Sequence, residues 1–285
     1  MLEFRPAPLP SLRKKLGAEL LRRSDRDQEC PADSLGGLRI LVTDACSEVG
    51  RATAARLAAR GAQLVLVAPR SDQLVITCES IVAAGGLARW YRCDLSALGD
   101  VDQLVRWTLT ECGTVDVLVN NAGRPQRRPL AQSLDRFRDY QRMMAANYFG
   151  PLRLTLGLLP AMLQSGSGQV VNVGPWNRDT GAAPHFASYA AAQAAWTTFG
   201  RSADAELSAH GIQVSAVQYP ATDAVAPGTQ FGHEYALDPV GAASAVETVI
   251  RTHPGRIEPR LARTLRNLAG VAPRSTNRFR QALGI

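Results

Sequence analysis

The sequence contains very little lysine. Of its 32 basic residues, 30 are arginine, and the two lysines, Lys14 and Lys15, both lie near the start of the chain. A mechanism that needs a lysine ammonium group or a lysine Schiff base therefore cannot operate after residue 15. Codon bias towards arginine is the simplest explanation for the deficit, and the exclusion holds whatever its origin.

Histidine and cysteine are also scarce, which limits metal and disulfide chemistry. The four histidines lie far apart without an HExxH pattern, and the five cysteines include no CxxC pair. An odd number of cysteines without the spacing of metal ligands is typical of a chain in a reducing compartment. We therefore expect no structural metal and a cytoplasmic location.

Long apolar segments are missing as well. No apolar run reaches 18 residues, and no apolar stretch follows the basic residues near the N-terminus. The sequence thus predicts neither a transmembrane helix nor a secretory signal. With 46% hydrophobic and 20% charged residues, the composition is that of a folded globular protein rather than a disordered one.

The net charge of +7 is concentrated at the two ends of the chain. Residues 1–36 are rich in proline and charge, and three leucines at helical spacing (Leu12, Leu16, Leu20) predict a short amphipathic helix. That helix either packs on the body of the protein or makes a peripheral membrane contact. The basic ends lack interleaved aromatic residues, which argues against nucleic acid as a partner.

From residue 38 onwards, short apolar runs alternate with helical stretches. The runs are typical of strands buried on both faces, and they occupy residues 38–43, 63–68, 88–93, 115–120, 168–173 and 212–217. Such alternation predicts an α/β fold with a Rossmann-like, doubly wound parallel sheet. We expect one domain over 37–255, an N-terminal extension over 1–36 and a basic, helical C-terminal segment over 256–285 that packs on the domain.

Helices are expected between the strands and near the C-terminus. The predicted helices cover 51–61, 71–86, 101–112, 133–165 and 187–211, and then 239–252, 257–269 and 274–283. No second core and no solenoid-type repeat is visible in the pattern. A ligand crevice is expected at the carboxyl ends of the strands.

Four short motifs then occur in a particular order along these elements. They are Asn120-Asn121-Ala122-Gly123 after the fourth strand, Asp94-Leu95 after the third, Asn147 in the long helix, and Tyr189 before an alanine-rich helix. In order and spacing this set resembles the short-chain dehydrogenase/reductase family, from about residue 38 to residue 220. The resemblance implies a nicotinamide cofactor, with Asp94 near the adenine, Asn121 to Gly123 beside the nicotinamide pocket and Tyr189 as the catalytic acid or base.

The phosphate-binding turn departs from the family pattern. The family has Thr-Gly-x-x-x-Gly-x-Gly, whereas this chain has Thr43-Asp44-Ala45-Cys46-Ser47-Glu48-Val49-Gly50. Of the three glycines only the last, Gly50, is kept, and Asp44 and Glu48 bring negative charge to a site for pyrophosphate. Glu48 also suits the first turn of a helix without any ligand. The turn therefore predicts weak or absent nucleotide binding.

The remaining cofactor signal favours NADP(H) over NAD(H). The second strand is followed by Pro69 and Arg70, with no acidic residue to bind the 2′-hydroxyl of a ribose. Arg70 is suited to a 2′-phosphate, and it equally suits an exposed helix start. We therefore expect NADP(H), or no nucleotide at all.

The catalytic set departs further from the family. The family's lysine stands four residues after the tyrosine, where this chain has Gln193, and its serine stands about 13 residues before, where this chain has Trp176. A neutral glutamine can bind a ribose but cannot stabilise a phenolate. After the sixth strand, Pro220 is kept, but the glycine that follows it in the family is Ala221.

Two functions are open on these residues. The losses favour a degenerate family member, a pseudoenzyme that acts through binding or assembly. The alternative is an active NADP-dependent oxidoreductase with an atypical site and a small apolar carbonyl or alcohol substrate. In either case the resemblance implies a homodimer or homotetramer built on the helices near 133–165 and 187–210, where alanines at 190–195 allow close helix packing.

Overall fold

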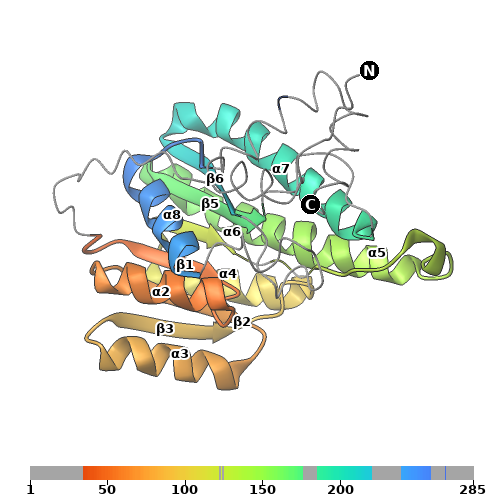
Figure 1. Ribbon diagram of the computed structural model, residues 1–285. Coiled ribbons are helices and arrows are strands. Elements are labelled where there is room, and N and C mark those ends of the chain that lie inside the picture. Colours follow the sequence, from red (N-terminus) through yellow and green to blue (C-terminus); the bar gives the residue numbers. More distant parts are fainter. Residues whose placement is uncertain are drawn as a thin grey trace, which may run out of the picture.

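The computed structural model describes residues 35–121, 123, 125–175, 185–219, 239–257 and 267. Its centre is a parallel sheet with the strand order β3-β2-β1-β4-β5-β6-β7 (Figure 1). The strands are β1 (Arg39–Thr43), β2 (Gln63–Ala68), β3 (Leu87–Arg92), β4 (Val117–Asn120), β5 (Gly168–Pro175), β6 (Ile212–Tyr219) and β7 (Arg256–Ile257). The six longer strands confirm the predicted Rossmann-like α/β fold.

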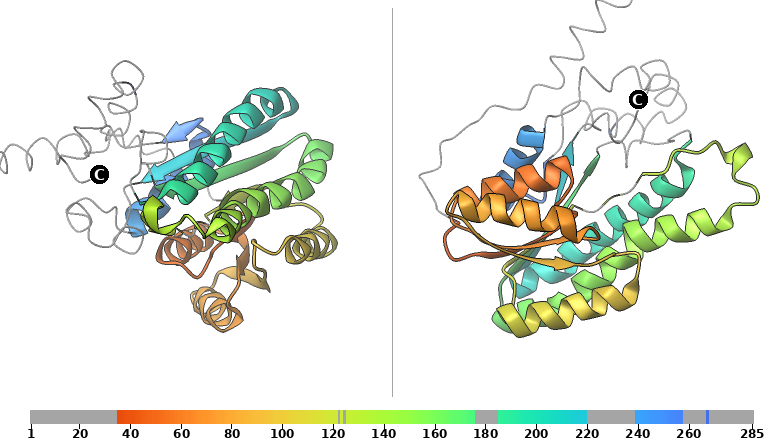
Figure 2. Two further views of the ribbon diagram at one scale, coloured as in Figure 1. Left: turned by 90° about the vertical axis from the view of Figure 1, so that its right-hand side faces the viewer. Right: turned by 90° about the horizontal axis from the view of Figure 1, so that it is seen from below.

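Helices cover both faces of the sheet (Figure 2). The α-helices are α2 (Glu48–Ala59), α3 (Ser71–Ala83), α4 (Leu98–Cys112), α5 (Phe137–Met144), α6 (Gly150–Ser165), α7 (Ala187–Leu207) and α8 (Pro239–Thr252). Two 3-10 turns, η1 (Leu130–Gln132) and η4 (Ser208–His210), and the π-helix η2 (Ala145–Phe149) complete the set. Helices α2, α3 and α8 lie over one core, and α4, α6 and α7 over the other.

The central strand β1 shows why the sequence forms a two-faced sheet. Ile40, Leu41 and Val42 are all fully buried, because successive side chains of a strand point to opposite faces. Ile40 and Val42 join the core under α2 and α8, whereas Leu41 joins the core under α4 and α6. An uninterrupted apolar run is thus the pattern that a strand covered on both faces requires.

Three features differ from the predicted elements or extend them. The long helix expected over 133–165 is divided into α5, η2 and α6, and the π-helix places Asn147 at the interruption. The short strand β7 pairs with β6 at the start of the segment that was predicted to be helical. The predicted helices near the N-terminus and over 274–283 lie outside the described residues, and the division into 1–36, 37–255 and 256–285 stays a prediction.

A buried carboxylate connects α2 to α8 on one face of the sheet. The Glu247 side chain is 3% exposed, and both of its oxygens are engaged by arginines. Arg56 Nε donates to Oε2, Arg60 Nε lies 3.0 Å from Oε1, and Arg251 Nη1 lies 3.6 Å from Oε1. Because Arg56 and Arg60 come from α2, this cluster fixes the two helices against each other.

Within the described ranges, no helix is long and apolar enough to cross a membrane. This agrees with the sequence over those ranges, while the cytoplasmic location and a membrane contact through residues 1–36 stay predictions. No group of three or more potential metal ligands occurs in the same part of the chain.

The strand order reverses between β1 and β4. From β1 the chain continues outwards to β2 and β3, and from β4 it continues the other way to β5, β6 and β7. Ligands of doubly wound sheets bind outside the carboxyl ends of the strands at such a reversal. The segments after Thr43 and after Asn120 lie at this point, so the candidate site is sought there.

Candidate nucleotide site and active site

The turn between β1 and α2 is tight and is held by hydrogen bonds within it. Ser47 is the N-cap of α2: its Oγ accepts from Gly50 N at 3.0 Å and donates to Asp44 O at 2.8 Å. Arg51 Nη1 donates to the carbonyl oxygen of Cys46 at 2.6 Å and braces the turn from the helix side. The first amides of α2 therefore stand in a fixed arrangement at a helix N-terminus, where anions bind.

The backbone conformation of this turn depends on two positions. Asp44 adopts a φ of 49°, a left-handed conformation that aspartate tolerates better than most residues. A Cβ added to Gly50 would lie 2.2 Å from Asp44 O, so glycine is required there. The one glycine that the sequence keeps is thus the one against which the backbone packs.

Of the two roles that the sequence left open for Glu48, the structure agrees with the one at the start of a helix. It is the first residue of α2, and its side chain is exposed, so it complements the positive end of the helix dipole without filling the turn. Val49 is buried in the adjoining core. Of the two carboxylates expected to repel a pyrophosphate, only Asp44 lines the pocket described below.

Thr43 and Asn121 connect the turn to the end of β4. Thr43 Oγ1 accepts from Asn121 N at 3.0 Å and lies 3.4 Å from Val119 O. Asn121 Nδ2 in turn donates to Ser47 Oγ at 3.2 Å. The structure therefore brings Asn121 together with Thr43 and Ser47, two predicted cofactor residues that lie more than 70 positions before it in the sequence.

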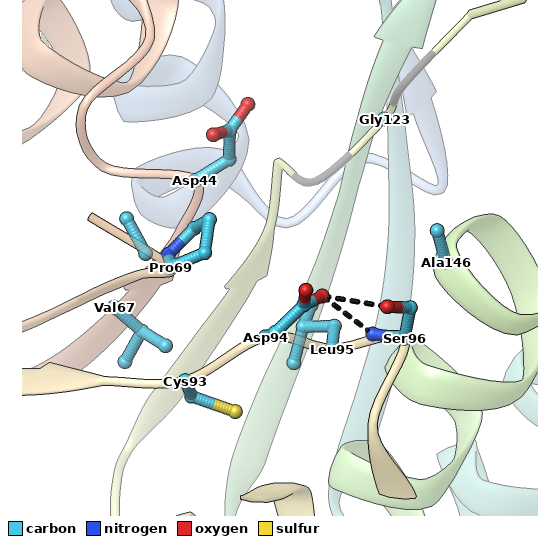
Figure 3. A pocket seen from close by; sticks show the side chains of 10 residues that line it. Asp44, Val67, Pro69, Cys93, Asp94, Leu95, Ser96, Gly123 and Ala146 are labelled. Atoms are coloured by element: carbon cyan, nitrogen blue, oxygen red, sulfur yellow. Dashed lines mark hydrogen bonds between the residues drawn. The ribbon is translucent and has the colours of Figure 1, made fainter.

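A pocket opens beside this turn, at the ends of β2 and β3. Figure 3 shows Asp44 and Pro69 on one side of it and Ala146 on the other, with Asp94 between them. Asp94 Oδ1 accepts from Ser96 N at 3.0 Å and from Ser96 Oγ at 2.8 Å, which fixes the carboxylate. The remaining lining residues are Val67, Ala68, Cys93, Leu95 and Gly123.

The walls of this pocket are mostly apolar and uncharged. Burial raises the pKa of the Cys93 thiol to about 12, so this side chain stays neutral. Asp44 and Asp94 are the two carboxylates of the lining, and the fixed carboxylate of Asp94 among apolar groups suits a flat heterocycle with an amino group, such as adenine. Ser96 contributes to this arrangement and was not predicted. Its position two residues after an aspartate is the signal of an Asx turn, which would have indicated it.

Arg70 precedes the first residue of α3 and lies near the pocket without lining it. Its side chain is 62% exposed, and Nη2 lies 3.9 Å from an Asp72 oxygen. An exposed pair of this kind contributes little to stability. Arg70 is therefore able to turn towards a 2′-phosphate, and the preference for NADP(H) stays a prediction.

The candidate catalytic side chains converge on Gly123. A Cβ placed on Gly123 would lie 3.6 Å from Tyr189 Oη, 3.8 Å from Gln193 Nε2 and 3.9 Å from Asn147 Oδ1. All three side chains are buried, with exposures of 6%, 1% and 1% in that order. The structure thus assembles these predicted residues, with glutamine at the lysine position.

Their supporting elements explain the convergence. Tyr189 and Gln193 are four residues apart on α7, so they lie on one face of that helix. Asn147 lies in the π-helix η2, and its Nδ2 donates to Met143 O at 3.0 Å. Single π-helical turns inside α-helices occur frequently at functional sites. Three predicted site residues, Ala122, Trp176 and Pro220, lie outside the described residues.

The residues present fit a dinucleotide. The turn offers helix N-terminal amides, the pocket offers Asp94, and one buried polar atom, Gln193 Oε1, has no partner among the residues that the structure describes. Buried acceptors are normally hydrogen-bonded, so this oxygen can accept from a donor that a ligand brings.

Comparison with known proteins establishes the family. The model of the short-chain dehydrogenases matches residues 39–231, and the chain belongs to this family. A fatty acyl-CoA reductase of Mycobacterium tuberculosis is 38% identical over 96% of this chain and 92% of its own length. A fatty acyl-CoA reductase of Acinetobacter baylyi is 35% identical over 86% of this chain and 83% of its own length.

Solved structures agree with the family. A metagenomic short-chain oxidoreductase in complex with NADP is similar with a TM-score of 0.69 and 28% identity, over 79% of this chain and 97% of the other. The actinorhodin polyketide ketoreductase with NADPH has a TM-score of 0.70 and 25% identity, over 82% and 99%. Both neighbours hold a phosphorylated nicotinamide cofactor, consistent with nucleotide binding.

The prediction of an inactive family member is therefore wrong. Relatives that match 86% to 96% of the chain at 35% to 38% identity are named as reductases, which favours the alternative, an active oxidoreductase. Two features, one in the turn after β1 and one in α7, explain why the substitutions are compatible with activity. Asp44 adopts the conformation for which the family uses glycine, and Gln193 keeps a polar group beside Tyr189.

Proposed function

We propose that the protein is a reductase that uses NADPH to reduce the carbonyl group of a long-chain fatty acyl-CoA thioester. The observation that carries the proposal is the convergence of Tyr189 Oη, Gln193 Nε2 and Asn147 Oδ1 within 4 Å of one point beside Gly123. The names of the two bacterial relatives support the substrate class.

Each part of the crevice has a role in this proposal. The amides after Ser47 bind the pyrophosphate, Asp94 binds the adenine amino group, and Arg70 binds the 2′-phosphate. NADPH is favoured over NADH because Pro69 and Arg70, rather than an acidic residue, directly follow β2 and because both structural neighbours named above hold the phosphorylated form. When bound, the cofactor supplies the hydride.

Tyr189 supplies the proton in this proposal. Its hydroxyl donates to the carbonyl oxygen of the substrate, and solvent returns a proton to it after each turnover. Loss of the CoA thiolate, which then takes up a proton, leaves a fatty aldehyde. One NADPH and one proton thus convert one thioester into one aldehyde, one free thiol and NADP⁺.

The experiment is an assay of the purified full chain with palmitoyl-CoA and NADPH. We expect loss of NADPH absorbance, release of one free thiol per NADPH and formation of hexadecanal. NADH in place of NADPH tests the cofactor, and acetyl-CoA in place of palmitoyl-CoA tests chain length. Absence of NADPH consumption with palmitoyl-CoA contradicts the proposal, even where hexadecanal is reduced.

We also propose that the protein forms a homodimer or homotetramer through α6. Phe149, Leu156 and Leu163 are spaced seven residues apart at or beside this helix, and they are 47%, 50% and 41% exposed. A stripe with this period lies on one side of a helix, and exposed stripes of large apolar side chains mark contact surfaces.

The variant Leu156→Asp is expected to lower the molecular mass in solution to that of a monomer, because a carboxylate would be buried in the contact. Light scattering after size-exclusion chromatography measures this. Ile76→Asp is the matched control, since Ile76 is 66% exposed on α3 and away from the stripe. An unchanged mass for Leu156→Asp places the contact elsewhere.

A further inference from the structure

The segment that joins β4 to η2 projects from the body of the protein. Residues 125–144 lie at the far right of Figure 1 and of the right-hand view in Figure 2. This segment contains η1 and α5, and we call it the lobe. Gly123 precedes the lobe, and Asn147, whose Oδ1 lies 3.9 Å from the point beside Gly123, follows it. The lobe therefore leaves the catalytic crevice and returns to it.

Hydrogen bonds hold the base of the lobe in a defined conformation. The Asp139 side chain is buried, and its Oδ2 accepts from Gln126 Nε2 at 3.2 Å and from Arg136 Nε at 3.3 Å. Arg128 N donates to His185 O at 2.6 Å, which ties the lobe to the residues before α7. The outer part of the lobe is thus presented on a fixed backbone.

Three large apolar side chains of the lobe are exposed to solvent. Leu130, Leu134 and Phe137, which we call the apolar tip, are 63%, 84% and 71% exposed. Successive turns keep them close along the chain, since Ser133 N donates to Leu130 O at 2.9 Å and Arg136 N to Ser133 O at 3.0 Å. Exposed apolar groups that are gathered in one place mark an interaction site.

Positive charge flanks the apolar tip. Residues 125–144 contain five arginines and two aspartates. Arg127 and Arg138 are exposed and form no ion pair with any residue that the structure describes. Arg142 is 72% exposed, and its nearest approach to a carboxylate is 3.9 Å, at Asp139. Asp135 is the one exposed carboxylate of the lobe. The surroundings of the tip therefore complement an anionic surface.

We propose that the lobe docks on an anionic lipid bilayer, with the apolar tip among the acyl chains and Arg127, Arg138 and Arg142 at the lipid phosphates. Leucine and phenylalanine beside basic residues are typical of segments that lie in a membrane interface, and long arginine side chains keep their charge at the headgroups. A symmetric contact between two copies would bring arginine against arginine, and the residues that dominate protein contacts are rarely leucine. These features favour a bilayer over a protein partner.

Docking through the lobe would bring the crevice close to the bilayer. The eight residues of α5 span about 12 Å and lead directly into η2, which carries Asn147. Long-chain acyl thioesters collect in bilayers because each buried methylene group favours the transfer from water. The benefit for substrate delivery rests on the proposed reductase function, whereas the docking itself does not.

The first test is flotation of the purified full chain with vesicles of phosphatidylglycerol and phosphatidylcholine, without substrate. We expect wild type to bind and the double variant Leu134→Ser, Phe137→Ser to have a partition coefficient at least about tenfold lower, because two apolar groups leave the contact. The double variant Ile76→Ser, Leu87→Ser is the matched control and should bind like wild type, since these side chains are 66% and 62% exposed on α3 and β3. No binding by wild type, or equal binding by the tip variant, overturns the proposal.

The second test removes charge from the lobe. The double variant Arg127→Gln, Arg138→Gln should bind vesicles with phosphatidylglycerol about tenfold to thirtyfold more weakly, and phosphatidylcholine alone nearly unchanged. The control pair Arg106→Gln, Arg201→Gln removes exposed arginines from α4 and α7 and should have a much smaller effect. Equal effects of the two pairs contradict the proposal. It is also wrong if the lobe pair leaves vesicle binding unchanged and raises KM for the water-soluble hexanoyl-CoA, since the arginines then bind the CoA phosphates.

The third test places a reporter in the apolar tip. Phe137→Trp introduces an indole whose emission should shift to shorter wavelength on vesicles and should be quenched by lipids with brominated acyl chains. Subtraction of the wild-type signal removes the contribution of the four native tryptophans. Binding without quenching of this indole would show that another segment, such as the basic residues 1–36, makes the contact, and would overturn the proposal. Flotation and quenching need no turnover, so an inactive protein would refute the reductase function and leave the docking decided.

Discussion

Tyr189→Phe should lower the rate of reduction by about a thousandfold. The substitution removes the hydroxyl that lies 3.6 Å from the point beside Gly123 and leaves the ring in place. A positioned proton donor typically accelerates a reaction by about 10² to 10⁴, and its loss costs the same factor. The measurement is kcat for NADPH-dependent reduction of palmitoyl-CoA, together with NADPH affinity, which should change little.

The control for this variant is Tyr148→Phe. Tyr148 lies in η2, one residue from Asn147, and its ring packs against Phe149 and Trp196. It therefore shares the surroundings of the site without being one of the atoms that converge on Gly123. A similar loss of rate in both variants, or a loss below about threefold in Tyr189→Phe, contradicts the assigned role.

Glu247→Ala should lower the free energy of unfolding by about 2 to 3 kcal/mol. The alanine leaves Arg56, Arg60 and Arg251 close together without the buried carboxylate that they share. Removing one member of a buried ion pair costs about 3 to 5 kcal/mol. We expect a loss at or below the lower limit of this range because the three arginine side chains are 20% to 43% exposed and regain water. Urea denaturation followed by circular dichroism measures the loss.

Two further variants define this effect. Glu247→Gln keeps the shape and part of the hydrogen bonding, so it should cost less than Glu247→Ala. Asp102→Ala removes the partner of Arg153, an exposed pair with an Nε–Oδ1 distance of 2.7 Å, and should cost much less than Glu247→Ala. Equal losses for Glu247→Ala and Asp102→Ala would contradict the role of burial.

Much of the fold was predictable because it follows from periodicity. Each buried strand is an apolar run without alternation, and the segments between the runs have the length and pattern of helices. The π-helix was not predictable in this way. It interrupts the stretch from Phe137 to Ser165 that the pattern predicts as one helix, and Gly150-Pro151 directly follow the interruption.

The sequence predicted which residues belong to the candidate site, but not the direction of their side chains or the conformation of their backbone. The structure brings Tyr189, Asn147 and Gln193, which the motifs singled out, close to Gly123, and their roles stay predictions. What they could not provide is the direction of a side chain or the state of a backbone. Glu48 is exposed rather than pressed against the turn, and this difference depends on where α2 begins.

The misjudged function has the same origin. Counting the lost glycines treated each loss as a loss of geometry, although aspartate can adopt the left-handed conformation that position 44 requires. The remaining glycine, Gly50, is the position where a Cβ would strike the backbone. A residue that replaces a motif residue therefore abolishes the function of the motif only where it cannot adopt the same backbone conformation or make the same contact.

The central claim is that this chain transfers a hydride from NADPH to a fatty acyl carbonyl. The most direct measurement is mass spectrometry of the product formed from palmitoyl-CoA and NADPH that carries deuterium in place of both hydrogens at C4 of the nicotinamide ring. The account predicts hexadecanal that carries one deuterium with the wild-type chain and almost none with Tyr189→Phe. Unlabelled product, or no product beyond that of a reaction without protein, would contradict it.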